Sequence, residues 1–189
     1  DLMKTVYVIL LAIAFVLLMS CTNANVTQEY DDTAAYDAEV QESELAVYQG
    51  DGYSFSYPAV WNIKEQEGVV SIVSPVTSEA DAFAENVNVM LLPAEEGATL
   101  EDYGASALDG LEGAIQGFTL EAYEDALLSE TEAKRIVYTE SSAEEVLKYV
   151  QVFTLQDGVL YVLTFAGADN EFPLYEEDVN VIMDSFVVE

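Results

Sequence analysis

The carboxylate side chains of this sequence are numerous enough to suggest a chemical function. The 189 residues include 36 Asp and Glu against 5 Lys and Arg, one Cys and no His, for a net charge of −31. The absence of His excludes a histidine-based nucleophilic triad. Two carboxylates can hydrolyse glycosides when they line a cleft with pKa values pushed apart. Nearly every loop of this chain supplies a carboxylate, so no pair stands out. We assign no catalytic residue, expect no enzyme, and rank a carboxylate-based hydrolase third among the functions considered.

Calcium binding is a second chemistry open to these carboxylates, because calcium takes about six to eight oxygen ligands. The runs Asp169-Asn170-Glu171 and Glu176-Glu177-Asp178 offer such oxygens. Neither run has the alternating acidic spacing of a calcium-binding loop, and acids early in a helix also complement its dipole. We predict solvated surface acids there, assign no metal ligand and no cofactor, and keep calcium as an alternative.

The single cysteine, Cys21, follows a short apolar segment. Lys4 precedes an unbroken apolar run from Val6 to Met19, and the small Ser20 comes next. A charged start, a short apolar run and a small residue are typical of a secretory signal peptide. As a helix the run would be roughly 21 Å long, shorter than the roughly 30 Å hydrocarbon core of a bilayer. We predict a signal peptide at residues 1–20, with an uncleaved membrane anchor as the alternative.

The sequence Leu18-Met19-Ser20-Cys21 resembles the lipobox of prokaryotic lipoproteins, although Met19 is bulkier than the usual occupant of its position. The resemblance implies that Cys21 is lipidated and becomes the first residue of the mature chain. The protein would then be anchored to the outer face of the cytoplasmic membrane. A lone cysteine also excludes an internal disulfide, so the domain does not depend on an oxidising compartment for its stability.

Residues 21–46 are predicted to form an acidic, flexible tether. The stretch from Thr22 to Gln49 has seven acidic residues, no basic residue and no sustained apolar period. Mutual repulsion should keep such a chain extended. Asn25-Val26-Thr27 is a glycosylation sequon in this segment, so Asn25 is a candidate glycosylation site.

Charge restricts the partners of the domain predicted at residues 47–189. From Gly50 to Glu189 there are 28 acidic and 4 basic residues, a net charge of −24. Such a surface repels nucleic acid and anionic lipid head groups, so we expect neither as a direct partner of the domain. The 12 Tyr and 8 Phe argue for a folded core. So many acids with so few bases suggest a halophilic setting, in which salt screens the self-repulsion.

Alternating apolar residues predict a series of strands. The predicted strands cover Tyr53–Tyr57, Trp61–Ile63, Val69–Val73, Asn86–Leu92, Thr119–Leu128, Ala133–Glu140, Leu147–Gln156 and Val159–Ala168. Asp157-Gly158, between the last two, is the strongest hairpin signal in the chain. Short turns between consecutive strands favour antiparallel pairing.

Two helices are predicted among these strands. Thr99 and Asp102 resemble a capping box, with apolar residues at helical spacing behind it and Gly117 as the expected C-cap. A second apolar stripe runs from Phe172 to Phe186, with Pro173 suited to the first turn. The predicted fold class is α+β, an antiparallel sheet flanked by helices.

Two groups of residues could act as binding sites. Tyr53, Phe55, Tyr57 and Trp61 could stack on a ligand, but strand alternation explains them as one core face, which we favour. Lys134 and Arg135 could bind an anion, but the side chains of consecutive residues on a strand point to opposite faces. We therefore expect each of the two to pair with nearby acidic side chains.

The sequence Tyr53-Ser54-Phe55-Ser56-Tyr57-Pro58 followed by Trp61 resembles the opening F-x-x-P-x-x-W of PsbP-like domains. The segment from Tyr161 to Phe165, with the helix that ends at Ser185-Phe186, resembles their last strand and helix. The resemblance implies an α/β/α sandwich of the PsbP/Mog1-like fold. The photosynthetic members are extrinsic lumenal subunits of photosystem II that help retain calcium and chloride.

The chain departs from that family in two respects. It has no histidine for a zinc or manganese site, and the domain has few basic residues for docking. We therefore carry over fold and membrane placement but no functional residue. The function expected is an extracytoplasmic, lipid-anchored accessory module that binds a protein partner in a membrane complex. The alternative is a calcium-associated extrinsic subunit of such a complex.

Overall fold

The computed structural model describes residues 44–75 and 84–189. The predictions for the signal peptide, Cys21, Asn25 and most of the tether lie outside these residues. The elements, in order, are β1 (Leu45–Gln49), β2 (Tyr53–Pro58), β3 (Asn62–Gln66), β4 (Val69–Val73), β5 (Asn86–Pro93), α2 (Leu100–Ala114), β6 (Phe118–Leu128), β7 (Thr131–Ser141), β8 (Val146–Gln156), β9 (Val159–Ala168), α3 (Phe172–Asp184) and β10 (Val187–Val188). Neither helix within the described ranges is long and apolar enough to span a bilayer.

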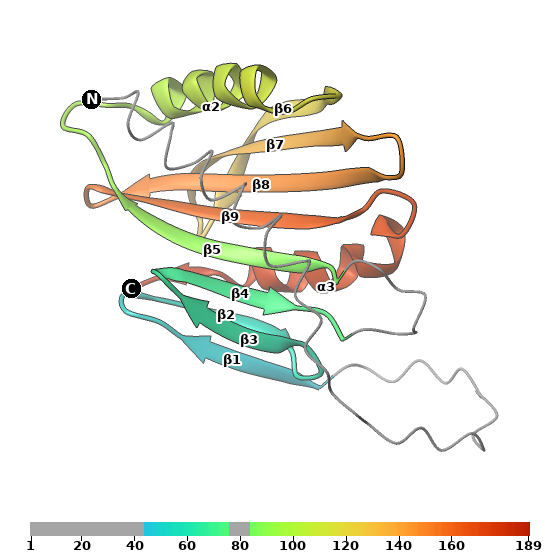
Figure 1. The fold of residues 1–189 in the computed structure, drawn as a ribbon. Helices are drawn as coiled ribbons and strands as arrows, with labels where there is room; N and C mark the ends of the chain where they lie inside the picture. The colour runs from blue at the N-terminus through green and yellow to red at the C-terminus, as the bar shows by residue number, and fades with distance from the viewer. Residues whose placement is uncertain (1–43, 76–83) are drawn as a thin grey trace.

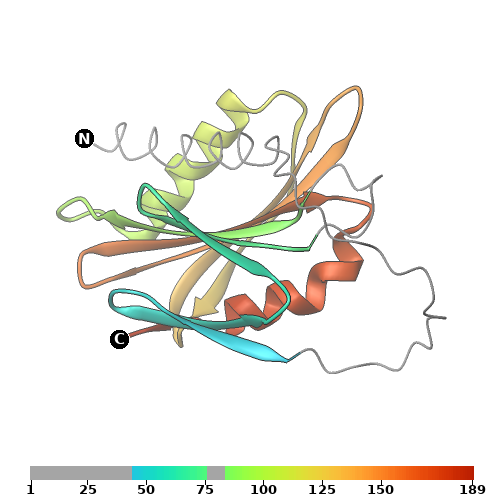
Figure 2. The same cartoon turned by 60° about the horizontal axis from the view of Figure 1, so that its bottom comes forward.

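The strands form two antiparallel sheets (Figure 1). The large sheet has seven strands in the order β3-β4-β5-β9-β8-β7-β6, and the small sheet has three in the order β1-β2-β10. Helix α2 packs on one face of the large sheet, while α3 contacts both β9 of the large sheet and β2 of the small one (Figure 2). The predicted α+β class is confirmed. The sequence predicts one sheet, whereas the described residues form two.

Three tight hairpin turns share one backbone conformation. Asp157 and Gly158 have φ of 50° and 79°, and Glu67 and Gly68 have φ of 51° and 83°. Positive φ at both central residues gives a turn whose twist matches that of the flanking strands. The predicted Asp157-Gly158 hairpin is therefore confirmed. The turn between β6 and β7 has the same conformation, although it contains no glycine.

Helix α2 begins with the predicted capping box. The Asp102 amide donates to Thr99 Oγ1 at 3.2 Å, and the Asp102 carboxylate accepts from the Thr99 amide at 2.9 Å. The prediction of Gly117 as C-cap is wrong, because the helix ends at Ala114 and the extended Ile115 caps it. Gly117 has φ of 74° and lies so close to the backbone oxygen of Ser141 that a Cβ atom would collide with it. Gly117 therefore shapes the turn just before β6 and does not cap the helix.

The core has one layer on each face of the large sheet. Beneath α2, Tyr103, Ala107 and Leu111 pack against residues of β5, β7, β8 and β9. On the opposite face, Val179, Ile182 and Met183 of α3 pack with inward side chains of the small sheet. Both helices therefore bury the apolar stripes that the sequence predicted.

Phe186, just after α3, joins the two sheets. Its ring is fully buried and lies 5.5 Å from Tyr53 and 6.3 Å from Phe55 of β2, and 6.1 Å from Tyr161 of β9, centroid to centroid. One side chain thus contacts aromatic rings of both sheets and helps to fix the small sheet in place.

The first strand lies partly within the predicted tether. Strand β1 begins at Leu45, two residues before the predicted domain start at Val47. Its larger aliphatic residues, Leu45 and Val47, are exposed, and Ala46 and Tyr48 face the protein. Its alternation therefore does not identify a buried face.

Candidate functional site

The small sheet has two faces of different character. Tyr48, Tyr53, Phe55 and Tyr57 face the core, and their neighbours along the strands point the other way. We call that second side the outer face, formed by Leu45, Val47, Gln49, Ser54, Ser56 and Val187. None of these six side chains is charged. Leu45, Val47 and Val187 are 49%, 68% and 47% exposed, so three exposed apolar side chains lie on this face of a strongly acidic protein, with Ser54 and Ser56 of β2 between the two on β1 and the one on β10.

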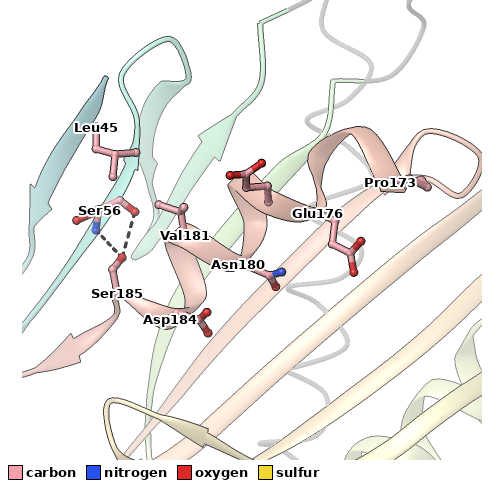
Figure 3. A pocket seen from close by; sticks show the side chains of 9 residues that line it. Leu45, Ser56, Pro173, Glu176, Asn180, Val181, Asp184 and Ser185 are labelled. Carbon is pink, nitrogen blue, oxygen red and sulfur yellow. Dashed lines mark hydrogen bonds between the residues drawn. The ribbon is translucent and has the colours of Figure 1, made fainter. Parts of the chain in front are cut away.

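A groove of about 670 Å³ separates the outer face from α3 (Figure 3). It is lined by Leu45, Ser56, Pro173, Glu176, Glu177, Asn180, Val181, Asp184 and Ser185. Three of these residues are exposed acids and none is basic. The groove can therefore accept an apolar group flanked by positive charge.

Two hydrogen bonds fix the end of the groove. The Ser56 amide donates to Ser185 Oγ at 2.8 Å, and the Ser185 hydroxyl lies 3.3 Å from the Ser56 carbonyl oxygen (Figure 3). They attach the end of α3 to β2 at a point that β10, which pairs with Tyr53 and Ser54, does not reach. The position of α3 relative to the outer face is therefore set by direct contacts.

The predicted aromatic cluster belongs to the core. Tyr53, Phe55 and Trp61 are buried and Tyr57 is half-buried. The Trp61 indole donates to Asp178 Oδ2 at 3.2 Å and packs edge-on against Tyr175. Burial raises the pKa of Asp178, and the hydrogen bond from Trp61 lowers it in part. Trp61 thus anchors α3 to the chain that follows β2.

The acidic runs considered for calcium do not come together as a cluster. Glu176 and Glu177 line the groove, whereas Asp178 accepts from Trp61. Asp169 lies 3.6 Å from the Lys148 ammonium. Within residues 44–75 and 84–189, no group of three or more His, Cys, Asp or Glu side chains is arranged to hold a metal ion.

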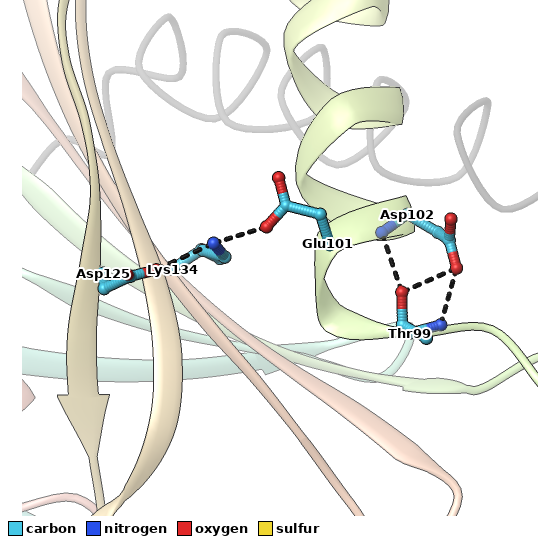
Figure 4. A network of polar contacts seen from close by, with 5 residues as sticks. All are labelled: Thr99, Glu101, Asp102, Asp125 and Lys134. Atoms are coloured by element: carbon cyan, nitrogen blue, oxygen red, sulfur yellow. Dashed lines mark hydrogen bonds and ion pairs between the residues drawn. The ribbon is translucent and has the colours of Figure 1, made fainter.

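The paired basic residues lie on opposite faces of β7, as predicted. Lys134 bridges Glu101 of α2 at 2.5 Å and Asp125 of β6 at 2.7 Å (Figure 4). Its hydrogen bonds to these two carboxylates raise the pKa of Lys134. Arg135 pairs with Glu124 at 2.6 Å. Both residues pair with nearby carboxylates, as expected, and neither is available to bind an anion.

Sequence reasoning missed the outer face. The sequence places Leu45 in the tether and Val47 at its boundary, and Val187 follows the last predicted helix. The available signal was local: Leu45–Gln49 is an uncharged run of five residues directly after an acidic stretch.

The chain is similar to a known protein family and to several solved structures. A family model described as PsbP-like protein matches residues 4–188. Cyanobacterial PsbP (CyanoP) from Synechocystis sp. PCC 6803 is similar at 17% identity over 83% of this chain and 98% of that chain, with a TM-score of 0.60. LpqN, involved in cell envelope biogenesis of Mycobacterium tuberculosis, is similar at 15% identity over 79% of this chain and 86% of that one, with a TM-score of 0.54.

The Ran-binding protein Mog1p of Saccharomyces cerevisiae is similar at 9% identity over 77% of this chain and 96% of that one, with a TM-score of 0.55. At such identities these structures show the PsbP/Mog1-like fold alone. A comparison with curated proteins found no match.

Proposed function

This chain belongs to the PsbP-like protein family, and on that premise we propose that it is an extracytoplasmic, lipid-anchored accessory module that binds a protein partner without catalysis. The lipid would be carried by Cys21, and the acidic segment up to β1 would hold the domain away from the membrane. The partner is a component of a membrane complex on the outer side of the cytoplasmic membrane.

The outer face is the observation that carries this proposal. Solvent-exposed apolar residues scattered singly need no explanation, but apolar residues grouped on one face often mark an interaction site. Leu45 and Val47, two residues apart on β1, and Val187 across β2 lie on one such face of a domain with a net charge of −24 from Gly50 onward. A charged surface around an uncharged face favours a partner that covers that face.

The comparisons support this proposal in outline. Mog1p is named for binding Ran, and LpqN is named for a role in cell envelope biogenesis. We propose that this chain likewise acts by binding and that it does so in the cell envelope.

Membrane anchoring is tested by mass spectrometry of the native N-terminus together with detergent partitioning. The proposal expects a lipidated Cys21 at the N-terminus and partitioning into the detergent phase, both lost in Cys21→Ala. A mature chain that keeps residues 1–20 and carries no lipid would contradict the anchor.

Partner binding is tested by co-purification after crosslinking in native membranes, at the salt concentration in which the organism lives. Val47→Lys places a charge on the outer face and should remove the co-purifying protein. Leu127→Lys is the matched control, because Leu127 is 71% exposed on β6 and Val47 is 68% exposed on β1. Equal recovery from both variants would contradict the outer face as the binding surface. A calcium-specific rise in melting temperature, beyond that given by matched ionic strength, would instead favour the calcium-associated alternative.

A further inference from the structure

Strand β1 forms an open edge of the small sheet. Within residues 44–75 and 84–189, the order β1-β2-β10 leaves β1 paired on one side only (Figure 1). The Ala59 amide donates to the Glu44 carbonyl oxygen at 2.8 Å, which marks residues 44 and 59 as a hydrogen-bonded pair. Because such pairs alternate along an antiparallel ladder, Ala46 and Tyr48 also bond to β2. The backbone N–H and C=O groups of Leu45, Val47 and Gln49 therefore point away from the sheet.

Two other edges of the described fold carry the charges that normally prevent strand pairing. Strand β6 carries Glu121, Glu124 and Asp125, and β3 carries Lys64 and Glu65. Charged residues on an edge strand are a common protection against addition of another strand. The fourth edge, β10, has only two residues. Strand β1 has five residues and no charge, so it lacks this protection.

The opposite side of β2 is already occupied. Tyr53 and Ser54 pair with β10, and the Ser56 amide donates to Ser185 Oγ. The free edge of β1 is therefore where the small sheet can be extended, and it borders the exposed side chains of Leu45 and Val47.

We propose that β1 accepts an extended segment of the partner protein as a fourth strand of the small sheet. This inference rests on the proposed function and adds its mode of binding. Main-chain hydrogen bonds to Leu45, Val47 and Gln49 supply affinity, and alternate side chains of the segment supply specificity. One set of those side chains lies on the outer face beside Leu45 and Val47, and the other lies on the inner side of β1.

Charge identifies the kind of segment that fits. On the inner side of β1, the Tyr48 hydroxyl donates to Glu65 Oε1 at 3.1 Å. At the end of the strand, the Gln49 amide donates to Glu189 Oε1 at 2.5 Å. Glu44 precedes the strand and Asp51 follows it. A segment that alternates apolar and basic residues places its apolar side chains on the outer face and its cations on the inner side of β1, near Glu65.

A second copy of this chain is a poor occupant of the same edge. Pairing of two β1 strands would bring two sets of Glu44, Asp51, Glu65 and Glu189 together, and like charges in close contact are unfavourable. The same acids attract a basic segment, so the surface favours a different protein.

The test uses the full chain in detergent micelles and a fluorescent peptide of alternating Val and Lys, with binding followed by anisotropy at the lowest salt concentration at which circular dichroism shows the domain to be folded. Val47→Pro removes the outward N–H of β1 and leaves the inward hydrogen bonds of Ala46 and Tyr48, as edge positions allow. Val47→Ala keeps the backbone donor and is the matched control. We expect Val47→Pro to weaken binding about tenfold and Val47→Ala to weaken it only about two- to threefold.

Peptides provide a second measurement that does not depend on folding of the proline variant. Two versions of the Val-Lys peptide, N-methylated either at every Val or at every Lys, block opposite edges of the peptide strand. Strand addition requires one version to bind the unaltered protein much more weakly than the other. A peptide of alternating Val and Glu should not bind.

The outcomes separate this inference from the function on which it rests. Equal binding of both N-methylated peptides, or binding unchanged in Val47→Pro, would overturn strand addition. If Val47→Lys still abolished co-purification from membranes, the outer face would remain the binding surface. A dimer of the full chain that Val47→Pro dissociates would assign the edge to a second copy and overturn the proposal of a basic segment.

Discussion

Truncation of Phe186 should strongly destabilise the domain, because this ring joins the small sheet to the large one. It is fully buried and contacts the rings of Tyr53, Phe55 and Tyr161. Removal of a buried Phe side chain costs about 3–5 kcal/mol through lost burial and the cavity left behind. Loss of three ring contacts, each worth about 0.5–1.5 kcal/mol beyond burial, favours the upper end of that range.

The expected loss is a large share of the stability of an ordinary domain, which is about 5–15 kcal/mol. At about 3–4 °C per kcal/mol for a domain of this size, Phe186→Ala should lower the melting temperature by about 10–20 °C. Urea unfolding gives the free energy and thermal melts give the melting temperature, both followed by circular dichroism in 2 M potassium chloride, because high salt screens the surface repulsion that would otherwise add to the loss.

Val187→Ala is the matched control, one residue further along the chain. Val187 is 47% exposed and lies on the outer face, so its truncation should cost less than about 1 kcal/mol. A loss below about 1.5 kcal/mol for Phe186→Ala, or equal losses for both variants, would refute the reasoning that Phe186 fixes the small sheet.

Three further predictions concern charge and capping. The melting temperature should rise steeply between about 0.1 M and 2 M potassium chloride, because the Debye length falls from roughly 10 Å to a few ångströms; a flat response would remove the halophilic interpretation. Thr99→Ala should cost about 1 kcal/mol through loss of the α2 cap, and Thr99→Ser, which keeps the hydroxyl, should restore most of it in chemical denaturation. Burial raises the folded pKa of Asp178, so its ionisation opposes folding as pH rises through that pKa. Asp178→Asn should therefore be more stable than the wild type at pH 7 and equal to it near pH 3, as measured by thermal melts. Asp184→Asn, at an exposed position, is the control, and the same pH profile for both variants would contradict this prediction.

The sequence predicted the local structure well where a local rule decides it. Asp157-Gly158 gave its hairpin, and Thr99 with Asp102 gave the capping box, because turn and cap chemistry depend on only a few neighbouring residues. The turn at Ser129-Glu130 carried no glycine to mark it, and Gly117 was misread because a glycine after a helix equally suits the next turn.

The pairing of distant segments was beyond such rules. Strand β5 lies next to β9, and β2 lies between β1 and β10 at opposite ends of the domain. Leu45, Val47 and Val187 come to lie on one face only through this pairing. The sequence alone therefore does not show that they share a face. By contrast, the core role of Tyr53, Phe55 and Trp61 follows from strand alternation and was predicted.

Site-specific photocrosslinking reports directly whether a partner protein binds to the outer face of the small sheet. A photoreactive residue is placed at Val47 in one variant and at Leu127 in another, and native membranes are irradiated at the organism's own salt concentration. We expect that one protein is crosslinked through position 47 and not through position 127. Crosslinking at position 127 alone, or the same products from both positions, would contradict a binding function located on the outer face of the small sheet.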